Sequence, residues 1–86
     1  MRNASKFSVY NRSGMKVEFM LSWMSGSQKM TMSYSQSMSL FQLDDNTEVT
    51  VEGKIGSTPT SLMFNYKHNA SPLAIEVYQD GSYSTN

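Results

Sequence analysis

The sequence contains no cysteine, which excludes disulfide bonds, thiolate catalysis and cysteine-ligated zinc. Only three of its 86 residues are alanine, whereas serine and threonine are abundant, so β-compatible and turn-forming residues outnumber strong helix formers. No apolar run approaches the roughly 20 residues of a transmembrane helix, and the first ten residues contain no signal-peptide run. Seven acidic residues balance seven basic ones, so the net positive charge typical of nucleic-acid binders is absent. We therefore expect one soluble domain over residues 1–86.

Hydrophobic and polar residues alternate over several short segments, and this period of two predicts β-strands. The clearest segment is residues 15–23, where Lys16 and Glu18 lie between apolar neighbours. The same pattern recurs over residues 6–10, 49–55, 61–67 and 73–78, with turn-forming residues between the segments. It predicts an all-β fold, a small antiparallel β-sandwich of about seven strands, with a barrel as the alternative. We expect loose polar ends at residues 1–5 and 82–86.

Residues 30–43 contain no charged side chain. As one strand they would span roughly 45 Å, longer than strands of small domains, so we expect a break near residues 35–37. Beyond the break the parity of the apolar residues changes, which indicates a bulge or a strand buried on both faces. A helical turn over residues 38–41 is the alternative.

A strand without lysine or proline lacks the usual protection of a sheet edge. We therefore expect residues 30–43 to be central in a sheet or to pair with another chain. The leading hypothesis is a noncatalytic interaction module that self-associates into a homo-oligomer or captures a protein partner by β-strand pairing. Its binding residues on this segment would be Met30, Met32 and Tyr34.

Polar and aromatic residues near predicted turns form a second candidate binding surface, because tyrosine and asparagine suit adaptable recognition loops. These residues are Tyr10, Asn11, Arg12, Tyr78, Asp80 and Tyr83. The surface would bind a glycan or a protein.

Methionine is unusually frequent, with eight residues in the chain. Met30 and Met32 would place two thioethers about 7 Å apart on one strand face, and soft sulfur ligands select Cu(I) or Ag(I). Residues 29–34 resemble the Met-x-Met strand of periplasmic copper- and silver-binding barrels. In that family a tryptophan caps the metal and a histidine completes the site, but here Trp23 and His68 are distant in sequence. We adopt the alternative that these methionines fill the core, and predict no metal or cofactor.

Three other segments are similar to strands of actinoporin-like and aegerolysin β-sandwiches. They are residues 11–14, 62–64 and 75–78. The resemblance implies a sandwich that binds a glycan or a membrane. The cluster of exposed tryptophans that these families use at membranes is missing, since Trp23 is the only tryptophan and its parity directs it inward.

The residues available for acid–base chemistry are few. His68 is the only histidine, and it lies in a predicted turn. The one carboxylate cluster, at residues 44–48, could bind calcium, but aspartate and asparagine also cap their own backbone in turns, and the EF-hand spacing is absent. No nucleophile elbow occurs. We therefore predict a turn at residues 44–48 and a protein that is not an enzyme.

Overall fold

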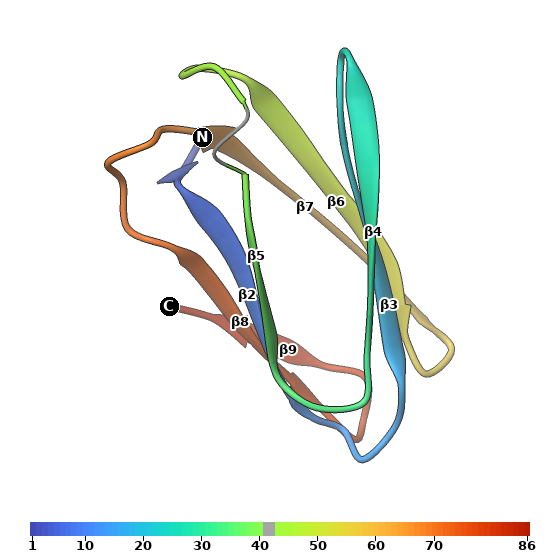
Figure 1. Ribbon diagram of the computed structural model, residues 1–86. Helices are drawn as coiled ribbons and strands as arrows, with labels where there is room; N and C mark the ends of the chain where they lie inside the picture. The colour runs from blue at the N-terminus through green and yellow to red at the C-terminus, as the bar shows by residue number, and fades with distance from the viewer. Residues whose placement is uncertain (41–42) are drawn as a thin grey trace.

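A computed structural model describes residues 1–40 and 43–86. All regular elements in these residues are β-strands, which pack as two sheets face to face (Figure 1) and confirm the all-β sandwich prediction. The strands are β1 (Asn3–Ala4), β2 (Lys6–Arg12), β3 (Val17–Trp23), β4 (Gly26–Met32), β5 (Gln36–Ser39), β6 (Glu48–Ile55), β7 (Thr58–Tyr66), β8 (Leu73–Tyr78) and β9 (Tyr83–Thr85).

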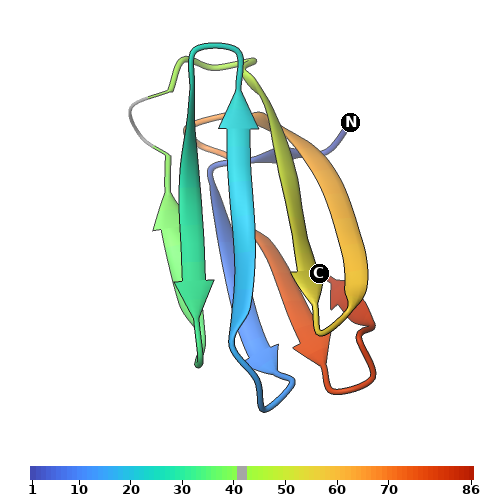
Figure 2. The same ribbon diagram turned by 90° about the vertical axis from the view of Figure 1, so that its right-hand side faces the viewer.

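One sheet has the strand order β1-β7-β6-β3-β4 and the other has the order β5-β2-β8-β9 (Figure 2). Most pairings are antiparallel, as predicted, but β1 pairs with β7 and β2 pairs with β8 in parallel. The alternation of apolar and polar residues shows which face of the sheet a side chain occupies. It is the same whether the neighbouring strand is parallel or antiparallel. The sequence therefore contained no signal for the parallel pairs.

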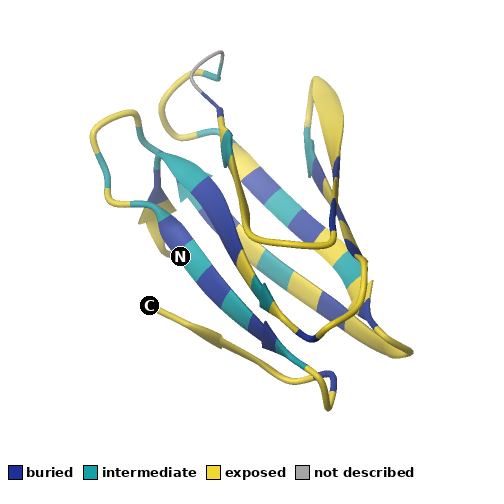
Figure 3. Cartoon of the chain, turned by 60° about the horizontal axis from the view of Figure 1, so that its bottom comes forward, coloured by how far each residue is buried: buried dark blue, intermediate teal, exposed yellow. Residues whose placement is uncertain are grey.

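The core lies between the inner faces of the two sheets. Every second residue of β3, from Val17 to Leu21, is buried, and the same alternation appears as bands along the strands in Figure 3. Phe7 of the four-stranded sheet meets Phe19 of the five-stranded sheet edge to face, with ring centroids 5.7 Å apart. This geometry is favoured between aromatic rings, so the pair joins the two sheets.

The uncharged segment is divided between the two sheets. It breaks at residues 33–35, beside the expected position, and its halves belong to β4 and β5. Each of these strands is the last in its sheet, so the expectation of a central strand is wrong. β5 extends over Gln36–Ser39, and Leu40 after it is not helical, so the alternative of a helical turn is wrong for residues 38–40. Phe41, the last residue of that turn, lies outside the described residues, as does part of the predicted bulge.

The expectation of loose ends is also wrong. Ala4 of β1 is fully buried, and β9 pairs with β8. The guanidinium group of Arg2 donates a hydrogen bond to Oδ1 of Asn86 at 2.8 Å, which ties the two termini together. Backbone pairing holds these segments, and their polar side chains gave no sign of it.

Gly53 of β6 provides a test of the packing between β6 and β3. A Cβ atom at this position would overlap the main-chain carbonyl oxygen of Glu18 and lie 2.8 Å from Cδ1 of Phe19. We expect Gly53→Ala to lower the free energy of unfolding by about 1–3 kcal/mol, as overpacking usually does. Urea denaturation measures this loss. The control Ser61→Ala, at an exposed position of β7, should change stability by less than about 0.5 kcal/mol, and equal stabilities of the two variants would contradict the close packing.

Candidate functional site

The uncharged segment contributes to two edge strands, β4 and β5, and β4 is the longer of the two. β4 has seven residues and pairs only with β3, while β5 has four and pairs only with β2. Figure 2 shows both strands at the left of the view, on the same side of the sandwich. Backbone groups on the outer side of an edge strand have no partner within the sheet.

The hairpin geometry identifies which groups of β4 are unpaired. A two-residue turn at residues 24–25 joins β3 to β4, so Trp23 and Gly26 form a hydrogen-bonded pair. Hydrogen-bonded and non-hydrogen-bonded pairs alternate along an antiparallel ladder. The N–H and C=O groups of Ser27, Lys29 and Thr31 therefore point away from β3, toward the open edge. Their side chains are exposed on the outer face of the sheet.

The edge of β7 is protected in a way that β4 is not. Its partner β1 covers only Asn65 and Tyr66. The turn at residues 56–57 makes Ile55 and Thr58 a hydrogen-bonded pair, so the next residue, Pro59, occupies an edge-facing position. Proline has no N–H to offer an incoming strand, and natural sheets use it at edges for this reason. β4 has no proline and keeps every edge-facing N–H; its only protection of the usual kind is the single charged residue Lys29.

The two candidate methionines lie in the core. Met30 and Met32 are buried opposite Phe19 and Val17. Trp23 is opposite Gly26, four residues along β4 from Met30, so the arrangement of the copper-binding barrels is not reproduced. Packing accounts for both methionine side chains.

Tyr34 differs from its two methionine neighbours in the predicted segment. It lies in the turn between β4 and β5, where it is 83% exposed. Of the three residues predicted to bind through this segment, it alone presents its side chain to solvent.

Three residues of the second predicted surface come together on the outer face of the four-stranded sheet. Tyr10 and Arg12 of β2 lie beside Glu76 and Tyr78 of β8 in the parallel register. Nε of Arg12 donates to Oε2 of Glu76 at 3.2 Å, and the hydroxyl of Tyr78 donates to the same oxygen at 3.0 Å. Tyr10 is about half exposed and borders a shallow pocket of about 160 Å³ that Glu76 and Ser84 also line.

The other three residues of that surface have separate positions. The Nδ2 group of Asn11 donates to the carbonyl oxygen of Met15 at 2.7 Å, so its amide stabilises the turn after β2. Asp80 accepts hydrogen bonds from the hydroxyl and N–H of Ser82, which lower the pKa of its carboxyl group. Tyr83 pairs with Val77, whose side chain faces the core, so it belongs to the other face of the sheet.

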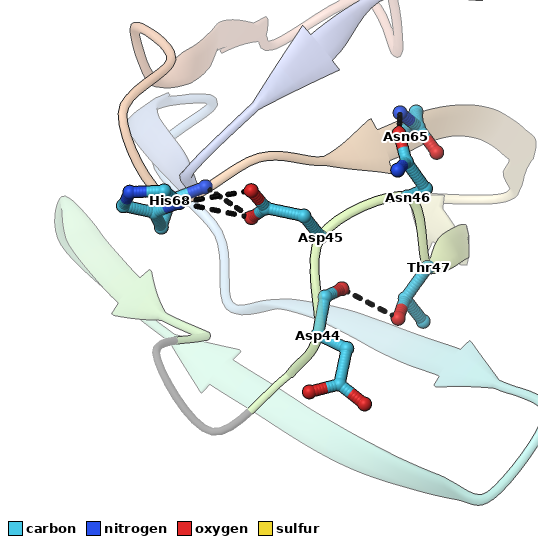
Figure 4. Close-up of polar contacts among 6 residues, drawn as sticks. All are labelled: Asp44, Asp45, Asn46, Thr47, Asn65 and His68. Carbon is cyan, nitrogen blue, oxygen red and sulfur yellow. Dashed lines mark hydrogen bonds and ion pairs between the residues drawn. The ribbon is translucent and has the colours of Figure 1, made fainter.

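The carboxylate cluster forms the predicted turn (Figure 4). The hydroxyl of Thr47 donates to the carbonyl oxygen of Asp44 at 2.7 Å, and Asn46 adopts a positive φ of 71°. Asp45 instead reaches across to His68. Its Oδ1 accepts the His68 N–H at 2.9 Å, and its Oδ2 is 2.9 Å from the His68 Nδ1. The sequence separates these two residues by 23 positions and gave no indication of this contact.

Within residues 1–40 and 43–86, no three histidine, aspartate or glutamate side chains gather as a metal site would require. The same residues contain no helix of the length and apolar character needed to cross a bilayer. Comparisons with family models, curated proteins and solved structures found no match.

The Asp45–His68 contact leads to a prediction for acid titration. The hydrogen bond from the His68 backbone N–H, and after it the one from the His68 ring, lower the pKa of Asp45 below its ordinary 3.8. Because the folded pKa is lowered, the stabilisation is complete above pH 3.8 and is lost as the pH falls through the folded value. We expect His68→Ala to raise the Asp45 pKa but to leave it below 3.8, since the backbone donor remains.

NMR titration of the Asp45 carboxyl carbon measures both values. The Asp80 carboxyl serves as an internal control, because its partner is Ser82. An Asp45 pKa unchanged by His68→Ala would show that the ring does not contribute.

Proposed function

We propose that this chain is a noncatalytic interaction module that self-associates by pairing β4 with β4 of a second copy. The observation that carries the proposal is the row of unpaired backbone groups at Ser27, Lys29 and Thr31 on a seven-residue edge. An added strand satisfies such groups, and this mode of binding draws its affinity mainly from the main chain. The protected state of the β7 edge supports β4 as the pairing strand.

Charge selects the register of the proposed pair. In an antiparallel arrangement centred on Lys29, two lysines would face each other directly, which is unfavourable. A register centred on Met30 instead places Lys29 of each copy opposite Thr31 of the other. Both residues have edge-facing N–H and C=O groups, so each such pair can exchange two backbone hydrogen bonds. The two five-stranded sheets then form one continuous sheet.

We predict that Thr31→Pro converts the dimer to a monomer. The substitution removes an edge-facing N–H and places the proline ring where the incoming strand would lie, while the ladder with β3 keeps its hydrogen bonds. Sedimentation equilibrium measures the association, and circular dichroism confirms that the variant is folded.

Two controls separate edge pairing from a general loss of stability. Thr31→Val keeps the backbone donor and should still dimerise. Ser61→Pro makes the equivalent change at an edge-facing position of β7 and should also leave the dimer intact. A wild-type chain that is monomeric at NMR concentrations, or equal association of the wild type and Thr31→Pro, would refute the proposal.

A second candidate function is glycan binding at the outer face of the four-stranded sheet. Its support is the half-exposed Tyr10 ring beside a pocket that Glu76 and Ser84 line, because sugars bind to an aromatic ring flanked by polar groups.

We predict that a glycan found by array screening loses its binding on Tyr10→Ala, which removes the aromatic surface. Tyr34→Ala, at an exposed tyrosine in the β4–β5 turn, is the matched control and should bind as the wild type does. An array without any hit would exclude this candidate.

A further inference from the structure

The carboxylate of Glu18 on β3 is directed toward the edge strand β4. Its Oε1 accepts a hydrogen bond from the hydroxyl of Thr31 at 3.4 Å and lies 4.0 Å from Nζ of Lys29. On the other side of β3, Lys54 of β6 is directly opposite Glu18, but among residues 1–40 and 43–86 Lys54 forms no ion pair. A negative charge therefore lies beside the open edge of the five-stranded sheet.

Glu18 and Lys29 both retain capacity for further partners. Their side chains are 54% and 60% exposed, and their separation of 4.0 Å is long for an ion pair. An ammonium group has three donors, and a carboxylate has two oxygens that accept several hydrogen bonds. An exposed pair of this kind contributes little to the stability of one chain, so both groups are able to contact charges on an added strand.

The proposed pairing of β4 with β4 brings a second Lys29 to the carboxylate of Glu18. In the register centred on Met30, Lys29 of the second copy is opposite Thr31, which is itself opposite Glu18. Side chains directly opposite each other share a face, so all three lie on the outer face of the sheet. The Cα atoms of Glu18 and the incoming lysine are about 10 Å apart, two strand spacings, and only the short side chain of Thr31 lies between them. The two-fold symmetry of the pair repeats this contact.

A different register does not produce the contact. Centring the pair on Gln28 would also separate the two lysines. It places Ser25 of the second copy opposite Thr31, and serine supplies no charge to Glu18. The position of Glu18 therefore favours the register centred on Met30 over its neutral alternative.

We propose that Glu18 selects a second copy of this chain as the partner of β4 by binding the ammonium group of that copy's Lys29, an inference that rests on the proposed function. Main-chain hydrogen bonds supply affinity but accept a strand of almost any sequence. Complementary charges across an interface supply the choice of partner and register. A foreign strand without a basic residue at this position lacks both of the contacts that the second copy makes.

Two charge reversals test this role. Lys29→Glu and Glu18→Lys each convert both attractive contacts of the dimer into repulsions, so we expect each variant alone to self-associate about tenfold more weakly than the wild type. An equimolar mixture again places unlike charges at both contacts and should associate about as tightly as the wild type. The ion pair within each copy is lost in both variants, mixed or not, so recovery on mixing reports only contacts between copies. Sedimentation equilibrium measures the association, and circular dichroism shows whether each variant is folded.

Glu52→Lys is the matched control, because it makes the same change of charge on the outer face of β6, farther from the edge. It should self-associate as the wild type does. Glu18→Gln removes the charge without placing a lysine opposite Lys54, and should weaken self-association about threefold even if Glu18→Lys does not fold.

The outcomes separate this inference from the pairing on which it rests. A monomeric wild type contradicts the β4 pairing itself. A dimeric wild type contradicts the role of Glu18 alone if the reversed variants associate normally, if their mixture does not regain affinity, or if Glu52→Lys weakens association equally.

Discussion

The contact between the inner faces of the two sheets is the constraint on which the rest of the molecule depends. Phe7 and Phe19 meet across this contact, and the buried residues of β2, β3, β6 and β8 surround them. A chain of this size has one core, so nearly every inward position must be apolar. Function is consequently limited to the outer faces, the turns and the strand edges, where side chains and backbone groups are not committed to the fold.

The same constraint explains why the edges matter. A sandwich does not close on itself, so each sheet ends in strands whose outer backbone groups have no partner. The short terminal strands β1 and β9 pair with some of these backbone groups, and Pro59 protects the edge of β7. β4 has neither a covering strand nor a proline, although it is as long as its interior neighbour β3. The asymmetry between β4 and β7 is a property of the sequence that becomes visible only when the ladder is known.

The sequence predicted those features that depend on side-chain alternation. The strands β3, β6 and β8 follow the predicted segments because each presents a regular row of apolar residues to the core. The parallel pairings, the terminal strands and the edge position of β4 depend on backbone hydrogen bonds, which leave no periodic signal. The Asp45–His68 contact joins residues distant in sequence, so only the fold could show it. Pro59 is a local sequence sign of an edge strand, because proline is tolerated in a sheet mainly at its edges.

The two functions proposed for the strand edge and for the Tyr10 surface use different groups of the chain, and this difference bears on how they would act together. Strand pairing at β4 uses main-chain groups, whose hydrogen bonds carry no net charge and depend little on ionic strength. Glycan binding beside Tyr10 uses side chains on the outer face of the other sheet. Lys29 influences the register of the β4 pair through direct contact with a facing strand, on the five-stranded sheet. The β4 edge and the Tyr10 pocket belong to different sheets, so assembly through β4 does not require a ligand in that pocket.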